Sequence, residues 1–239
     1  MDGRGNLDRL DKKNAVTSSV DNAVVPRDDT SPDAAQAGKE LTAMVAALMQ
    51  TRQTILPKRL APPGPDAEQL ALILGAAASA PDHGQLLPWR FVLVPADARD
   101  RLAEVFAAAL LERDGAATPE QLARARDKAQ RSPLLLLVVV DGLRGDPDID
   151  LFERIVSAGC AAQNMLLMAT ALGFGSALTS GKALKCGGLR RLFGLGDGEH
   201  ALCFVNIGTV QARKGERLRP VAADYVSTLM ADGAVRCGF

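Results

Sequence analysis

The stretch LLLLVVVDGLRGDPDIDLFERIVSAGCAAQNMLLMATALG, residues 134–173, decides the fold. Its first seven residues, Leu134–Val140, are too apolar for an exposed strand, so we expect them at the buried centre of a sheet. From Leu151 to Leu172 the sequence is apolar on nearly all sides of a helix, and Gly173 ends that helix. A helix without a polar face is buried, either inside a large domain or against a second subunit.

Helices and strands alternate irregularly on both sides of this stretch. Apolar residues at helical spacing predict helices near residues 41–49, 70–77, 102–115 and 189–193, and short apolar runs predict strands near 90–94, 176–179 and 202–207. Thr118-Pro119-Glu120-Gln121 has the N-cap, proline and capping-box glutamine of a helix start, and this helix is expected to reach about Gln130. Without strict βαβ alternation, the pattern favours an α+β fold over a doubly wound sheet.

The first 35 residues differ in composition from the rest of the chain. They are rich in Asp, Asn, Ser and Thr and have no hydrophobic period. Such a segment buries too little apolar surface to offset its ordering entropy. We therefore expect a mobile N-terminal extension over residues 1–35, with a partner-binding tail as the functional alternative, and one folded domain over residues 36–239.

The overall composition excludes several classes of function. Lys+Arg and Asp+Glu both total 28, so no global field attracts nucleic acid or an anionic membrane. Two histidines are too few for a histidine-rich metal site, and no metal is expected. The cysteines contain no C-x-x-C pair and suit a reducing compartment. As the N-terminus also lacks an apolar leader, a cytoplasmic protein is expected.

Three polar segments are candidates for binding a ligand. In Arg52-Gln53-Thr54 a guanidinium and a hydroxyl two residues apart can donate to a phosphate. Arg213-Lys214 is a second pair of cations, just after the last apolar strand. His83, followed by Gly84, lies in the turning segment APDHGQ, where it either caps a helix end or donates to a ligand. No glycine-rich phosphate loop with the required order and no catalytic triad is present.

Four segments together resemble the FMN-dependent nitroreductase-like family. They are Arg52-Gln53-Thr54 after an opening helix, APDH followed by PWRF (residues 80–83 and 88–91), SAGCAAQNM running to ALGFG (residues 157–165 and 171–175), and Asn206-Ile207-Gly208-Thr209. They occur in the family's order and cover residues from about 41 to 230. The resemblance implies a three-layer α+β fold with a central, mostly antiparallel sheet flanked by helices.

The resemblance also implies a set of FMN-binding residues. Arg52 and Thr54 would hold the phosphate and ribityl chain, with Gln53 between them, and Arg213, or Lys214 in its place, would reach the phosphate. The remaining implied contacts with the flavin are His83, Gly84, Leu178, Thr179 and Ser180. Gln53 and Thr54 replace the commoner Arg and Ser of the family, so phosphate binding rests on fewer positive charges.

The implied activity is that of an NAD(P)H oxidoreductase that reduces a nitroaromatic, quinone or enone by ping-pong hydride transfer. The flavin is the reactive group, so no catalytic side chain is expected. The resemblance further implies a homodimer with FMN at the subunit interface. Two alternatives remain: a flavin-binding protein without turnover that serves as a store, sensor or partner module, and a flavin enzyme of another type, such as an oxygen-using relative. The sequence does not choose between NADH and NADPH.

Overall fold

The computed structural model describes residues 32–213, 215 and 218–238. The chain divides into two units, residues 1–43 and 44–239. The first unit contributes the beginning of helix α1 (Pro32–Thr51), and the second contains the rest of α1 and all other elements. The expected mobile extension falls mainly on residues 1–31, which lie outside the described part of the chain. Residues 32–35 are helical, so helix α1 begins before the boundary at 35.

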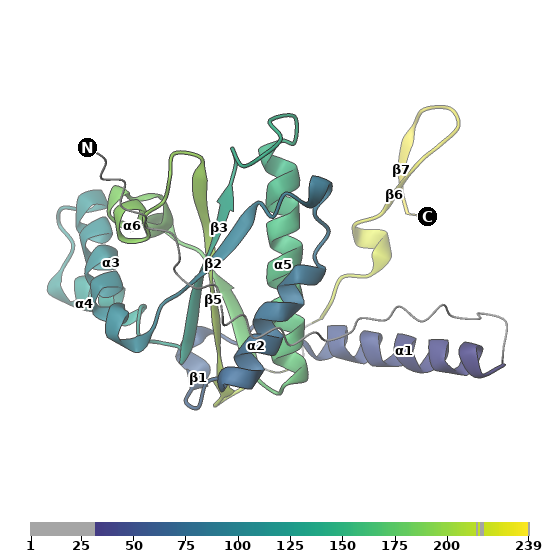
Figure 1. Ribbon diagram of the computed structural model, residues 1–239, viewed down its shortest axis with the longest axis horizontal. Helices are drawn as coiled ribbons and strands as arrows, with labels where there is room; N and C mark the ends of the chain where they lie inside the picture. Colours follow the sequence, from purple (N-terminus) through teal and green to yellow (C-terminus); the bar gives the residue numbers. More distant parts are fainter. Residues whose placement is uncertain (1–31, 214, 216–217, 239) are drawn as a thin grey trace, which may run out of the picture. The chain divides into compact units, whose positions relative to one another are not determined.

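A five-stranded sheet forms the centre of the second unit (Figure 1). Its strands pair in the order β1-β5-β3-β2, and β4 also pairs with β5. Every strand pair is antiparallel. The strands are β1 (Leu60–Ala61), β2 (Trp89–Leu93), β3 (Leu134–Asp141), β4 (Gly175–Thr179) and β5 (Glu199–Val210). The apolar run predicted as the buried centre is β3, an interior strand whose residues 135–140 are all buried.

Helices cover both faces of this sheet and make three layers (Figure 1). Helices α2 (Ala67–Ala76) and α5 (Leu151–Ala171) pack on the face that Leu136 and Val138 present. The opposite face, with Leu135, Leu137 and Val139, is covered by α3 (Arg99–Arg113) and α6 (Gly187–Leu192), and α4 (Pro119–Asp127) packs on α3. Alternate residues of β3 thus serve two separate cores. The predicted three-layer α+β fold is confirmed.

Local sequence signals account for most of the element boundaries. Thr118 and Gln121 form the predicted capping box at the start of α4, but this helix ends at Asp127, before the predicted Gln130. Short 3₁₀ turns connect the elements of the described residues: η1 (Pro57–Arg59), η2 (Ala77–Ser79), η3 (His83–Gln85), η4 (Ala96–Ala98), η5 (Lys182–Lys185) and η6 (Ala222–Asp224). A hairpin of β6 (Ser227–Leu229) and β7 (Val235–Cys237) was not predicted.

Helix α5 is buried on one side only. Met165 and Ala169 are fully buried against the sheet, whereas Phe152 is 76% and Val156 is 64% exposed. The sequence alternative in which part of this helix faces a second subunit therefore stays open for its outer face.

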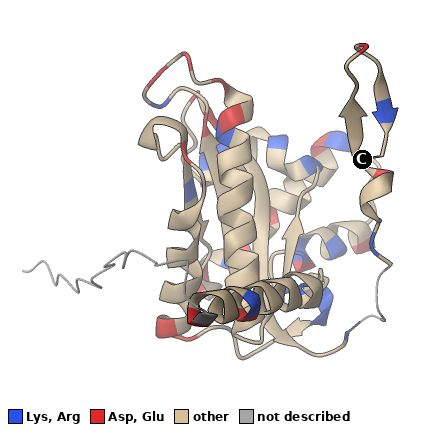
Figure 2. Cartoon of the chain, turned by 90° about the vertical axis from the view of Figure 1, so that its right-hand side faces the viewer, with Lys and Arg blue, Asp and Glu red and all other residues tan. Residues whose placement is uncertain are grey.

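Charges of both signs are spread over the helices and loops (Figure 2). The loop before α5 is acidic, with Asp146, Asp148 and Asp150. Within residues 32–213, 215 and 218–238, no helix has the length and hydrophobicity needed to cross a bilayer.

Candidate functional site

The segment Arg52-Gln53-Thr54 lies beside the first half of strand β4. Thr54 forms a parallel bridge with Ser176, and the Ile55 amide donates to the Ser176 carbonyl at 2.9 Å. The packing around Gly175 is tight, because a Cβ there would approach side-chain carbons of Val210 to 2.6 Å and of Leu60 to 2.9 Å. The Ser176 hydroxyl is buried and has no hydrogen-bond partner in the described part of the chain. This end of β4 therefore combines polar groups from two chain segments. One of these groups, the Ser176 hydroxyl, has no partner among the described residues.

The end of β5 lies at the same end of the sheet. The Gln211 amide, just after β5, donates to the Arg59 carbonyl at 2.9 Å, and β1 pairs with Thr209 and Val210. Arg213 follows within two residues and is exposed, and Lys214 lies outside the described residues. The structure therefore brings the two predicted cationic segments to one end of the sheet.

Arg219 is a third cation at this end, and the sequence analysis did not single it out. Its Nη2 donates to the carbonyls of Gln50 at 3.0 Å and Arg52 at 2.9 Å. A guanidinium at the C-terminal end of α1 satisfies carbonyls that the helix leaves unpaired and favours the helix dipole. No local motif predicts this contact, because it joins residues more than 160 positions apart.

Leu178, Thr179 and Ser180 form the second half of β4 and its exit. Thr179 Oγ1 accepts a hydrogen bond at 2.9 Å from Nδ2 of Asn206, which is buried in β5. Leu178 points to the opposite face of the strand and is 45% exposed. From Ser176 to Thr179 the strand advances about 10 Å. The predicted phosphate-binding and flavin-contacting segments thus lie along one strand.

His83 and Gly84 lie elsewhere in the same chain. His83 Nδ1 contacts Glu153 Oε2, in the first turn of α5, at 2.8 Å. Gly84 has a φ of 65°, which glycine adopts without the usual steric cost. The Asp82 carboxylate accepts the Leu87 amide at 2.7 Å and closes the turn. Within one chain, the His83 ring thus pairs with the Glu153 carboxylate and is largely exposed. Among the described residues it makes no hydrogen bond to a backbone group at a helix end.

Helix α5 separates the two groups of candidate residues. His83 contacts its first turn, and Ser176, which bridges to Thr54, follows its last turn. A helix of 21 residues is about 30 Å long. One chain therefore does not bring His83 and Arg52 into one site.

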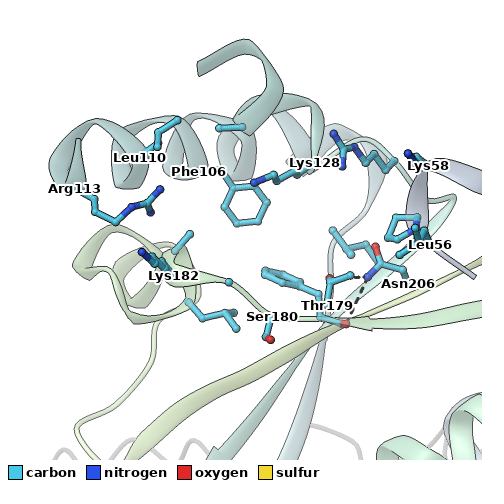
Figure 3. Close-up of a pocket in the computed structure, with 18 residues that line it drawn as sticks. Leu56, Lys58, Phe106, Leu110, Arg113, Lys128, Thr179, Ser180, Lys182 and Asn206 are labelled. Atoms are coloured by element: carbon cyan, nitrogen blue, oxygen red, sulfur yellow. Dashed lines mark hydrogen bonds between the residues drawn. The ribbon is translucent and has the colours of Figure 1, made fainter. Parts of the chain in front are cut away.

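A cavity of about 580 Å³ opens on the α3 side of the sheet, next to Thr179 and Ser180 (Figure 3). Apolar side chains of Phe106, Leu184 and Phe204 line its interior, and Phe106 meets Phe204 edge to face at 5.8 Å. Its other feature is a set of five cations from four parts of the chain: Lys58, Arg113, Lys128, Arg131 and Lys182. No Asp or Glu is among the described residues that line it.

The cavity and its cations were not predicted from the sequence. Its cations come from η1, α3, the residues after α4, and η5, so no spacing along the sequence connects them. The sequence identified Thr179 and Ser180 beside the cavity, but it gave no signal for Lys58 or Lys128. Such a set is visible only after the chain has folded.

The groups present fit FMN in their chemistry. Arg52, Thr54 and the cations that follow β5 can donate to a phosphate. Leu178 offers an exposed apolar surface on the same strand. Cations of the neighbouring cavity would favour negative charge on a bound ring. No group of His, Cys, Asp and Glu able to hold a metal ion occurs among the described residues.

The antiparallel sheet between two layers of helices, and the arrangement of these segments on it, are those of a nitroreductase-like protein. The model of the Nitroreductase family matches residues 49–209. A protein of Haemophilus influenzae named "Putative NAD(P)H nitroreductase" is 34% identical over 186 residues, which cover 76% of this chain and 97% of that protein. The chain therefore belongs to the Nitroreductase family, and it is an enzyme with the general role of an oxidoreductase.

Solved structures agree with this fold. A nitroreductase-like family protein from Bacillus cereus has a TM-score of 0.63 at 19% identity, covering 76% of this chain and 94% of that one. Iodotyrosine deiodinase, crystallised with FMN and 3-iodo-L-tyrosine, has a TM-score of 0.58 at 20% identity, with 74% and 96% covered. At these identities the likeness concerns the fold alone.

Proposed function

We propose that this protein is an FMN-dependent NAD(P)H oxidoreductase that reduces a small nitroaromatic, quinone or enone. The family membership and the name of the Haemophilus influenzae relative support the nicotinamide donor. The observation that carries the proposal is the bridge between Thr54 and Ser176. It holds Arg52-Gln53-Thr54, the segment that we propose binds the phosphate, at one end of β4, and Leu178, Thr179 and Ser180 follow at the other end.

The proposed cofactor contacts follow that strand. Arg52, Gln53 and Thr54, together with Arg213 or Lys214, would hold the phosphate and ribityl chain. Leu178, Thr179 and Ser180 would contact the ring. When bound, FMN supplies the two-electron chemistry that the side chains of this chain lack. One open site that serves the donor and the oxidant in turn would give ping-pong kinetics, visible as parallel lines in double-reciprocal plots.

We further propose a homodimer in which the partner supplies His83 and Gly84 to the same FMN. The distance along α5 supports this arrangement, because His83 and Arg52 of one chain lie near opposite ends of that helix. The outer face of α5 offers apolar contact surface at Phe152 and Val156. A second copy placed on this face in the opposite direction would bring each His83 towards the other chain's phosphate segment.

Substitution of Arg52 tests the cofactor assignment. We expect Arg52→Ala to weaken FMN binding by about 1.5–3 kcal/mol, because a charge-assisted hydrogen bond to the phosphate is lost. Equilibrium dialysis or flavin fluorescence measures the affinity. Arg124→Ala removes an exposed cation of α4 outside the cavity and serves as the control. Equal FMN affinity in wild type and both variants would contradict the proposed phosphate site.

A further inference from the structure

The charged side chains that line the cavity next to Thr179 are all cationic among the described residues. Among its five cations, Arg131 pairs with an acidic residue, Asp127, at 2.8 Å. The side chains of Lys58, Arg113, Lys128 and Lys182 have no hydrogen bond or ion pair within the described residues. Unpaired like charges around an apolar cavity repel one another and attract an anion.

Lys58, Lys128, Arg113 and Lys182 are spread along the cavity (Figure 3). Lys58 lies beside Leu56 at one end, and Lys128 lies between Lys58 and Phe106. Arg113, in the last turn of α3, and Lys182, in η5, lie at the other end, and these two elements contact each other. The end with Lys58 adjoins the proposed phosphate segment, whereas Arg113 and Lys182 belong to no segment assigned to FMN. Ser180, assigned to the ring, lies two residues before Lys182, so a second molecule held by Arg113 and Lys182 would lie beside the ring.

The interior between the two ends suits a flat apolar body. Phe106 and Leu110 of α3 line it together with Leu184 and Phe204, and the rings of Phe106 and Phe204 meet edge to face as one aromatic wall. Aromatic and aliphatic walls accept a planar ring, and a guanidinium presents paired donors that match a carboxylate. A neutral or cationic ring would leave the charges of Arg113 and Lys182 uncompensated.

We propose that the oxidant of this enzyme is an aromatic compound with a carboxylate substituent, which Arg113 and Lys182 bind at the far end of the cavity. The use of this compound as oxidant rests on the proposed function, whereas the binding of the anion can be measured separately. For a nitroaromatic, the first two-electron reduction converts the nitro group to a nitroso group. With FMN bound, NAD(P)H would supply two electrons and one proton, solvent would supply the second proton, and the nitro group would become a nitroso group with release of water.

The test compares two ligands that differ in charge. The affinities of 4-nitrobenzoate and the neutral 4-nitrobenzyl alcohol for the oxidised, FMN-loaded protein are measured by calorimetry at low and high salt. We expect the carboxylate to bind about tenfold or more tightly at low salt, because it forms charge-assisted hydrogen bonds. The preference should shrink at high salt, since the cations are exposed.

Variants assign this preference to particular residues. Arg113→Gln and Lys182→Gln are expected to bind the two ligands with nearly equal affinity and to retain FMN as wild type does. Arg101→Gln removes another exposed, unpaired cation of the same helix, outside the cavity, and should keep the preference. In turnover assays, KM for 4-nitrobenzoate should rise in the two cavity variants while KM for the alcohol stays unchanged.

Three results would overturn the proposal: equal affinity for the two ligands in wild type, an unchanged preference in both cavity variants, or loss of FMN from those variants. The last result would mean that these cations hold the cofactor. FMN content and bleaching by nicotinamide are measured first on the same preparation. If the protein holds no FMN, or if neither nicotinamide bleaches it, the proposed function and the role of the anion as oxidant are overturned. Carboxylate binding with the expected variant pattern would in that case still assign the anion site.

Discussion

Glu199 links two strands through its carboxylate. Arg90 of β2 donates from Nε to Oε1 at 2.6 Å and from Nη2 to Oε2 at 2.9 Å, and the Gly196 amide donates to Oε2 at 3.0 Å. The hydrogen bond from Arg90 is the largest cause that lowers the pKa of Glu199 below its usual value of 4.5. The pair joins the start of β5 to β2 across the interior strand β3.

This depressed pKa predicts a particular acid dependence of stability. Because folding lowers the pKa, the ion pair contributes fully above pH 4.5 and loses its contribution as the pH falls through the lower pKa of the folded state. Glu199→Gln should cost at most about 1 kcal/mol at neutral pH, because Arg90 is partly exposed, and the difference from wild type should vanish in acid. Urea unfolding at a series of pH values measures it. A difference that does not change with pH would contradict this role.

Cys203 illustrates the effect of burial on a thiol. It lies in β5 on the face packed by α5, and desolvation raises its pKa to about 11. We expect Cys203 to stay unmodified by iodoacetamide at pH 8 in the native protein and to react on unfolding, because the thiolate is the nucleophile. Peptide mapping by mass spectrometry detects the modified site. Rapid modification of Cys203 in the native state would contradict its packing.

The residues proposed to bind the cofactor could be selected from the sequence only where they lie close together in it. Arg52, Gln53 and Thr54 form one triplet, and the structure places them beside β4. The cations of the cavity come from segments between Lys58 and Lys182, so their association depends on tertiary structure. The contact between His83 and Glu153 was missed for the same reason.

At the scale of elements, the beginning of α5 is fixed by a buried arginine. Arg154 is 1% exposed, and its guanidinium donates to four backbone carbonyls, one at the end of β3 and three in the loop that follows. The acceptors are Asp141 at 3.3 Å, Arg144 at 2.5 Å, Asp146 at 2.6 Å and Ile149 at 2.8 Å. Asp150 caps the helix by accepting the amides of Phe152 and Glu153. One side chain thus shapes the loop that joins β3 to α5.

Removal of this guanidinium should unfold the loop before it affects the sheet. We expect Arg154→Met to destabilise the protein by about 3–5 kcal/mol, because several buried carbonyls lose their donor. Arg154→Lys keeps the charge but not the fork of donors, so it should recover only part of this loss. Urea unfolding gives the energies, and hydrogen exchange of residues 142–150 localises the change. Wild-type exchange rates in Arg154→Met would contradict the assignment.

Elements with a local signal were predicted better than those that need distant contacts. The capping box at Thr118 and the apolar run of β3 act within a few residues, and both were confirmed. The extension of α1 to Pro32 has no strong hydrophobic period, and the β6–β7 hairpin is exposed along its length, so neither shows the pattern of a buried element. Helix α5 was predicted in its extent, but the sequence left open which side would be buried.

At the scale of the whole molecule, the proposed dimer rests on the outer face of α5. Val156→Asp places a charge on an apolar position that is 64% exposed in one chain. We expect this variant to sediment as a monomer and to bind FMN more weakly, because it would separate His83 of one copy from Arg52 of the other. Leu111→Asp, at a position 48% exposed on α3 across the sheet, is the matched control and should stay dimeric. A wild-type protein that sediments as a monomer with bound FMN would contradict the two-copy site.

The central claim is that this chain passes electrons from a nicotinamide through FMN. The most direct measurement is anaerobic titration of the purified, FMN-loaded protein with NADH and with NADPH, followed by the visible absorbance of the flavin. We expect a yellow protein whose flavin absorbance at least one nicotinamide bleaches and a nitroaromatic or quinone then restores. A protein that stays colourless after addition of FMN would contradict flavin binding, and bound FMN that neither nicotinamide bleaches would contradict the proposed activity.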